Sequence, residues 1–266
     1  MEILVCIKQV PDDSVEISLN SSTGKPNFDG VTQIVNAFDT YALEMATRLK
    51  EKAGGEITVV SIGDESVKNS LKNCLAVGAD KAYLVKEDGA EGLDPAGISK
   101  NLVKAKEEIE NILGKKFDIL FFGKEATDYA SSQVGLLAAE ELSLPAAANV
   151  VDIEIEDGKA KIKQETEDGY NIIEAELPCI VTVQKPNYEP RYPTIKTKMA
   201  ARKKPIDELQ PAEKPESFME VVAFTKTGER LVGEPAKRQA GIKIKAETAE
   251  EAVAQAVKMM TDAKVF

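Results

Sequence analysis

The chain contains no histidine among its 266 residues. This excludes imidazole metal ligands, a Ser-His-Asp triad and the side chain that most often serves as a general base at neutral pH. We therefore expect any redox or transfer chemistry to come from a bound cofactor rather than from side chains.

Cysteine is also scarce. The three cysteines, Cys6, Cys74 and Cys179, are far apart and form no C-x-x-C pair, and two of them lie in apolar, strand-like runs. Zinc and iron-sulfur sites need clustered thiolates, so this spacing argues against a structural zinc or an iron-sulfur cluster supplied by this chain alone. We expect three inert core thiols.

Positive charge is in deficit, with 34 basic against 45 acidic residues and a net charge of -11. This balance repels phosphate backbones and anionic membranes, which makes nucleic acid an unfavourable partner. No apolar run approaches the ~20 residues of a membrane helix, and no basic-then-apolar leader precedes the first strand. The sequence predicts a cytoplasmic protein without membrane insertion, and 43% hydrophobic residues suffice for a core.

Two phosphate-binding motifs are missing. No G-x-G-x-x-G follows the apolar run Ile3 to Ile7, where a Rossmann fold would place it, and no G-x-x-x-x-G-K occurs. A long polar excursion follows that run, with a short alternating stretch at Val15 to Leu19 that indicates a hairpin. A nucleotide would have to be held differently.

Apolar strands then alternate with amphipathic helices as far as Leu142, and one long helix is expected to begin at Asp94-Pro95 and to end at Gly114. The predicted strands are Ile3 to Ile7, Ile57 to Ile62, Ala82 to Val85 and Ile119 to Phe122. This alternation predicts an α/β fold with a doubly wound, mostly parallel sheet of 3-2-1-4-5 order and helices on both faces.

The pattern changes after Pro145. Strand-like segments without intervening helices predict an antiparallel extension, with a return to the core at Cys179 to Val183. Gln184 to Pro205 is rich in proline and carries a basic run, so we expect it on the surface, either as a solvated patch or as a partner contact.

We expect residues 1-205 to form a nucleotide-binding domain and residues 206-266 a C-terminal arm. The arm ends in an amphipathic helix, Thr248 to Met260. Such an arm is compatible with docking on a partner subunit or with a mobile tail.

The stretch Asp118 to Gly135 reads as a strand, a polar turn and a helix. Ser131 and Ser132 are natural N-cap residues, and the N-H groups of the following turn could hold a phosphate; an ordinary strand-loop-helix joint is the alternative. In the predicted strand order the first and fourth strands are neighbours, so their carboxyl ends share one crevice.

Asn36 and Asp39 begin the helix that follows the excursion, and they either cap that helix in a variant capping box or join the crevice. The predicted cofactor-binding residues are Cys6, Ile7, Lys8, Asn36, Ala37, Phe38, Asp39, Ile62, Gly123, Lys124, Glu125, Ala126, Thr127, Asp128, Ser131, Ser132, Gln133 and Val134.

Several segments carry a family resemblance in their order and spacing: DGVTQIVNAFDTYALEMATRLKE, GKEATDYASSQVG, LPCIVTV and EPRYPTIKTKMAARKK. Together they resemble the β subunit of the electron transfer flavoproteins, densely over residues 1 to 210 and more thinly at QAGIKI near Gln239. The resemblance implies a heterodimer with an electron transfer flavoprotein α subunit. It also implies an adenine nucleotide held by Cys6, Asn36 to Asp39, Ile62 and Gly123 to Val134.

The family has two branches. In the simple branch the β subunit binds a structural AMP, and in the bifurcating branch it binds FAD. The β-bound FAD then takes a hydride from NADH and divides the electrons between ferredoxin or flavodoxin and the α-subunit FAD, which serves a flavin-dependent dehydrogenase. NAFDTYALE and KQVPD resemble the bifurcating branch, although Ala37 replaces the usual proline.

The resemblance also implies a docking segment for the partner dehydrogenase. It falls on Gln184, Lys185, Pro186, Asn187 and Tyr188. Relatives that serve acyl-CoA dehydrogenases often present a leucine there, which this chain lacks, so the partner stays open. The rival interpretations are a regulatory or ATP-hydrolysing nucleotide module, against which the missing Walker motif argues, and a scaffold with an empty crevice.

Overall fold

The computed structural model describes residues 1-89, 92-212, 218, 219, 221, 224, 244, 246 and 248-262. The chain divides into two compact units, Met1–Phe224 and Thr225–Phe266. Each is described by itself.

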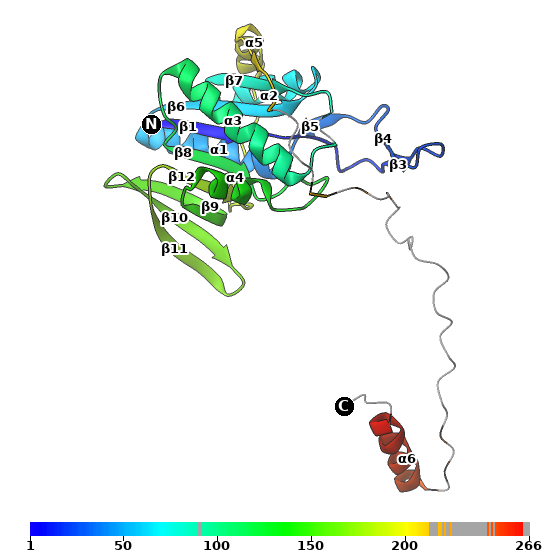
Figure 1. Ribbon diagram of the computed structural model, residues 1–266. Coiled ribbons are helices and arrows are strands. Elements are labelled where there is room, and N and C mark those ends of the chain that lie inside the picture. The colour runs from blue at the N-terminus through cyan, green and yellow to red at the C-terminus, as the bar shows by residue number, and fades with distance from the viewer. Residues whose placement is uncertain are drawn as a thin grey trace. The chain divides into compact units, whose positions relative to one another are not determined.

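The first unit is built on a nine-stranded sheet (Figure 1). Its strand order is β11-β10-β9-β12-β8-β1-β6-β7-β13. The strands are β1 (Glu2–Cys6), β6 (Glu56–Gly63), β7 (Lys81–Lys86), β8 (Ile119–Gly123), β9 (Ala146–Glu156), β10 (Lys159–Thr166), β11 (Gly169–Glu176), β12 (Cys179–Val183) and β13 (Asp207–Leu209).

The centre of this sheet confirms the predicted 3-2-1-4-5 order, read as β7-β6-β1-β8-β12. β1 pairs in parallel with β6 on one side and with β8 on the other. β12 pairs in parallel with β8, which confirms that Cys179 to Val183 returns to the core. β9, β10 and β11 form the predicted antiparallel extension, but β9 joins the sheet through a parallel pairing with β12.

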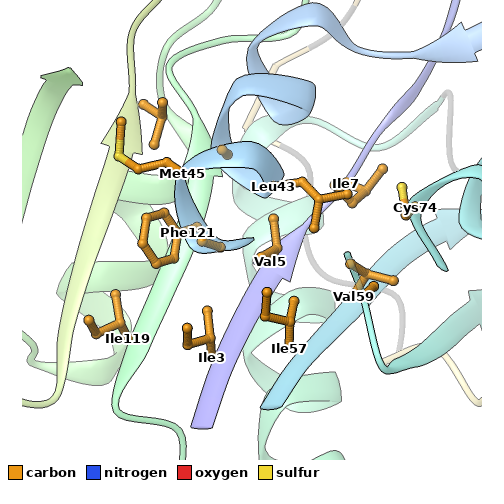
Figure 2. Close-up of a cluster of buried hydrophobic side chains, with 14 of the residues drawn as sticks. Ile3, Val5, Ile7, Leu43, Met45, Ile57, Val59, Cys74, Ile119 and Phe121 are labelled. Atoms are coloured by element: carbon orange, nitrogen blue, oxygen red, sulfur yellow. The ribbon is translucent and has the colours of Figure 1, made fainter. Parts of the chain in front are cut away.

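Helices cover both faces of the sheet, as predicted. α1 (Ala37–Ala53) and α2 (Val67–Val77) pack on one face, and α3 (Pro95–Leu113) and α4 (Val134–Leu142) pack on the other. Alternate strand residues enter the two cores: Ile3 and Val5 meet α1, whereas Leu4 and Cys6 meet the α3 side. Figure 2 shows the first core, with Phe121 and Ile119 beside Val5 and Ile3 beneath Leu43 and Met45.

Local signals set several helix ends. The Asp94 side chain accepts a hydrogen bond from the Gly97 N-H with Pro95 in the first turn, so α3 begins where the sequence predicts. Gly114 ends α3 in the left-handed conformation, which a residue without a Cβ adopts at little cost.

The excursion after β1 forms two small ribbons. β2 (Gln9–Pro11) pairs with β5 (Gln33–Val35), and β3 (Ser18–Leu19) pairs with β4 (Pro26–Asn27). The second pair is the hairpin that the alternation at Val15 to Leu19 predicts. The first pair brings the chain back beside the end of β1, so that α1 starts there.

The segment after β12 runs over the surface into α5 (Ile195–Lys203), and β13 then pairs in parallel with β7. β13 is an element that we did not predict from the sequence, because three residues carry no measurable periodicity. All three cysteines are free and buried, as predicted.

In the second unit the described residues form α6 (Ala249–Asp262), close to the predicted amphipathic helix. No residue of α6 is buried, and Val253, Val257, Met259 and Met260 are exposed. The QAGIKI segment near Gln239 lies outside the described residues. Among the described helices, none has the length and apolar character that crossing a membrane requires.

Candidate functional site

The carboxyl ends of β1 and β8 lie side by side because the two strands are parallel neighbours. Cys6 and Ile7 are buried at the end of β1, and Lys8 follows them. Gly123 ends β8, and the loop 124-133 leads to α4. The fold thus brings the two predicted loops to one edge of the sheet, which is where open α/β sheets bind ligands.

Asn36 joins these two loops. Its buried side chain donates a hydrogen bond to the Glu125 carbonyl oxygen at 2.8 Å and accepts one from the Thr127 N-H at 3.1 Å. Its own N-H donates to the Lys8 carbonyl oxygen at 2.9 Å. The expectation that Asn36 caps α1 through its side chain is wrong, because that side chain is committed to the 124-133 loop.

Asp39 makes a second connection between the two strand ends. One carboxylate oxygen accepts from the Lys8 N-H at 2.7 Å and the other from the Gly123 N-H at 3.1 Å. The capping-box role is therefore wrong for Asp39 as well. A Cβ on Gly123 would lie 2.3 Å from Oδ1 of Asp39 and 2.8 Å from Cβ of Phe38, so only glycine fits at this strand end.

The buried carboxyl group of Asp39 is electrostatically strained. Burial raises its pKa to about 7, against the hydrogen bonds from Lys8, Asn36 and Gly123, which favour the carboxylate. Burial, together with the nearby Asp39 charge, also raises the pKa of the Cys6 thiol well above its usual value. Cys6 is consequently a neutral thiol and no nucleophile.

Lys8 and Asp128 form an ion pair between the end of β1 and the loop that follows β8. The ammonium lies 2.8 and 2.7 Å from the two carboxylate oxygens, and the side chains are 36% and 18% exposed. The same ammonium lies 4.6 Å from the centre of the Tyr129 ring. A cation is thus held at the carboxyl end of β1, close to the loop that leads into α4.

The loop before α4 differs from the predicted cap. α4 begins at Val134 with Gln133 at the N-cap position and no side-chain capping bond, so the assignment of Ser131 and Ser132 as caps is wrong. Ser132 adopts a left-handed φ of 53° and donates from its hydroxyl to the Glu125 carboxylate at 2.6 Å. The Ser132 side chain therefore bonds within the 124-133 loop, to Glu125, instead of capping α4.

This conformation leaves a row of backbone donors open. Within the described residues, the N-H groups of residues 131-135 have no hydrogen-bond acceptor. Residue 135 is Gly135, whose missing side chain allows α4 to approach Thr182 and Phe122 closely. Unpaired N-H groups at the start of a helix, beside a lysine, suit an anion such as a phosphate.

Comparison with known proteins adds an independent observation. The family model described as "Electron transfer flavoprotein domain" matches residues 27-214. The electron transfer flavoprotein subunit beta of Thermoanaerobacterium thermosaccharolyticum is 41% identical over 196 residues, covering 74% of this chain and 73% of the relative. The chain belongs to the electron transfer flavoprotein family, as a β subunit.

Two further relatives are similar to this chain over most or all of their length. Caffeyl-CoA reductase-Etf complex subunit CarD of Acetobacterium woodii is 39% identical over 207 residues, with 77% of each chain covered. The electron transfer flavoprotein subunit beta of Bacillus subtilis is 34% identical over the full length of both chains. Like them, this β subunit serves electron transfer.

The remaining predicted cofactor residues of this electron transfer flavoprotein β subunit lie at the same edge of the sheet. Ala37 and Phe38 form the first turn of α1, and Lys124 donates its N-H to the Val183 carbonyl oxygen at 2.9 Å. Ile62 lies one strand away from β1, near the end of β6. No cluster of metal-binding side chains occurs within the described part of the chain.

The predicted docking segment is only partly available to a partner. Lys185 and Asn187 are exposed, but Pro186 is buried, and the Tyr188 ring lies under the Arg48 guanidinium, 3.7 Å from it. Three large apolar side chains that come soon after this segment in the sequence are exposed: Tyr192, Ile195 and Met199 are 87%, 82% and 59% exposed. Hydrophobic periodicity did not indicate this patch, because most residues of α5 are polar and exposed and form no apolar stripe.

Proposed function

We propose that the crevice between β1 and β8 holds the adenylate part of FAD, making this chain the β subunit of a bifurcating electron transfer flavoprotein. The observation that carries the proposal is the pair of bridges from Asn36 and Asp39. They hold the end of β1 and the loop after β8 in one site, next to the open N-H groups of residues 131-135.

Different residues of the chain contact different parts of the nucleotide. The N-H groups of residues 131-135 and the Lys8 ammonium receive phosphate oxygens, and Asp128 accepts a hydrogen bond from a ribose hydroxyl. The adenine ring lies at the end of β1, beside Cys6. Gly123 keeps the backbone close enough for Asn36 and Asp39 to fix both loops.

When held there, FAD would supply the redox chemistry of the bifurcating branch, with NADH as the hydride donor and with ferredoxin or flavodoxin and the α-subunit FAD as the electron acceptors. Support for this branch comes from NAFDTYALE and KQVPD, and from the similarity to a subunit of a caffeyl-CoA reductase-Etf complex. The alternative is a structural AMP in the same crevice. The Bacillus subtilis relative, similar over its full length, carries the general name alone.

The proposed partners use other surfaces. The unit Thr225–Phe266 docks as an arm on the α subunit, with the exposed apolar side chains of α6 as contacts. The dehydrogenase docks on Gln184 to Tyr188 and on the neighbouring apolar side chains of Tyr192, Ile195 and Met199. Basic residues surround this patch, including Lys196, Lys198 and Arg202, so a partner surface with an apolar pocket and an acidic rim fits it.

A cofactor count tests the proposal. The heterodimer is purified after co-expression with its α subunit, denatured, and its released nucleotides are separated and quantified. Two FAD per heterodimer with no AMP is the expected result. One FAD with one AMP would reject bifurcation and leave the simple branch, and a nucleotide-free β subunit would reject the crevice as a binding site.

A further inference from the structure

We infer that Glu44 is a positioning residue that clamps the docking segment against α1 through Arg191, and so fixes the apolar patch of Tyr192 and Ile195 for a protein partner. The inference rests on the proposed docking surface. It concerns a residue 140 or more positions away in sequence from the segment that it holds.

The clamp is a buried carboxylate with four donors. Arg191 donates to Glu44 from its backbone N-H at 3.1 Å, from Nε at 2.7 Å and from Nη2 at 3.2 Å. Arg48 donates from Nε at 2.7 Å, one helical turn away on α1. The Glu44 side chain is only 3% exposed, so these bonds form away from solvent, where charge-assisted bonds are strong.

The charge of Glu44 persists at neutral pH. Burial by itself would raise its pKa, but the hydrogen bonds from Arg191 and Arg48 outweigh burial and hold the pKa below the usual value. A buried carboxylate that lost these donors would bear a desolvation cost, which gives the segment a strong preference for this one position.

The clamp holds the segment at two further points. Arg191 also bonds the exposed carboxylate of Glu51 at 2.6 and 3.1 Å. Arg48, fixed by Glu44, covers the Tyr188 ring. Both ends of the short stretch 188-191 are therefore attached to α1, and Tyr192, which follows at once, is presented 87% exposed.

Presenting an apolar side chain to solvent has no stabilising effect on the free chain, whereas holding it in one place lowers the ordering cost of binding. The clamp thus acts on partner affinity more than on the electron-transfer step. This separates a positioning role from a merely structural one, because it predicts a change in KM for the partner with kcat unchanged.

The test uses the complete heterodimer and compares Glu44→Gln with Glu51→Gln. The two residues bond the same guanidinium, but only Glu44 is buried and reaches the Arg191 backbone. Hydrogen exchange should accelerate at the Arg191 amide by roughly tenfold in E44Q, the loss expected for one charge-assisted hydrogen bond, and by less than about twofold in E51Q. The probe is a flavin-dependent dehydrogenase that exchanges electrons with the wild-type heterodimer. Its KM should rise about fivefold or more in E44Q with kcat unchanged.

Unaltered exchange at Arg191 and unaltered KM in E44Q would overturn the clamp. Should E44Q fail to fold by circular dichroism, Arg191→Gln takes its place, because Glu44 then keeps Arg48 as its partner. Flavin and nucleotide content, measured on the same samples, report on the proposed function separately. A wild-type heterodimer that holds no flavin would reject that function, while the exchange at Arg191 would still decide the clamp.

Discussion

At the scale of single residues, the arrangement of the loops after β1 and β8 depends on two buried polar side chains at the start of α1. Asn36 and Asp39 are 1% and 5% exposed, and their hydrogen bonds reach the ends of both central strands. Buried polar groups cost free energy unless they are paired, so the loops that satisfy them are held firmly. These contacts explain why two loops 120 residues apart keep one geometry.

Asp39 should make stability depend on pH. Its pKa in the folded chain, about 7, lies above the unfolded value, so the folded state binds the extra proton between about pH 4 and 7. The contribution is fully present below about pH 4 and is lost as the pH rises through 7, at up to about 1.4 kcal/mol per pH unit. Urea unfolding at pH 5 and 7.5 should show this slope in wild type and a shallower one in Asp39→Asn. Parallel slopes would contradict the raised pKa.

Asp128→Ala combined with Ser132→Ala should weaken nucleotide retention while the fold stays intact. The first change frees Lys8 from its ion pair and removes the proposed ribose acceptor, and the second releases the Glu125 bond that shapes the loop. Asp12→Ala with Ser14→Ala is a matched control, since these residues bond each other in an exposed turn. Nucleotide released per subunit is the measurement, and equal content in both double variants would place the pocket elsewhere.

At the scale of elements, α1 and α4 have different tasks. α1 carries the bridges at its start and the Glu44 clamp two turns later, and its apolar face packs in the core with Ile3 and Phe121. α4 has no side-chain cap and instead lies close to the sheet through Gly135. Its position, and with it the row of open N-H groups, depends on a missing side chain.

Gly135→Ala should therefore displace α4. The new Cβ would lie 2.8 Å from Cγ2 of Thr182 and 3.1 Å from Cβ of Phe122, so the helix or the strands must shift. We expect a loss of about 1-3 kcal/mol in the free energy of unfolding, measured by urea titration, with weaker nucleotide binding. Leu136→Ala, on the exposed side of α4, should stay within about 0.5 kcal/mol. Equal losses of stability in the two variants would mean that the close contact of residue 135 with Thr182 and Phe122 does not limit substitution there.

At the scale of the whole molecule, the two compact units differ in what they bury. The unit Met1–Phe224 holds both cores, whereas the described residues of the second unit bury nothing in α6. An apolar helix face without a covering surface is typical of a segment that docks on another chain. This is the role that we propose for the arm.

A chain ending at Phe224 should fold like the full-length β subunit but fail to assemble with the α subunit. Every strand of the nine-stranded sheet lies before the truncation, so the urea midpoint should change little. Size-exclusion chromatography after co-expression with the α subunit is the measurement. Stable heterodimers of the truncated chain would rule out docking by the arm.

Most of the fold could be predicted from the sequence because its signals are local. The apolar runs of the central strands, the 3.6-residue helix period, the Asp94-Pro95 start of α3 and the Gly114 end each depend on neighbouring residues. They indicated the alternation of strands and helices, from which a doubly wound sheet with helices on both faces was expected. β13 escaped prediction because three residues are too short for a period.

The site was predicted as a set of residues but not as a set of contacts. Sequence reasoning favoured helix capping for Asn36, Asp39 and Ser132, since the N-H groups of the first helical turn are the nearest hydrogen-bond donors along the chain. The folded chain offers better partners 84 to 91 residues away for the first two.

The α/β class, the helices on both faces of the sheet and the buried cysteines could be predicted from the pattern of residues along the chain. The bridges from Asn36 and Asp39 between two strand ends, and the contact of Glu44 with Arg191 147 residues away, became visible only in the folded chain. Periodicity and capping are set by neighbours along the chain. The partner of a buried polar side chain, in contrast, is whichever group the packed sheet brings within hydrogen-bonding distance.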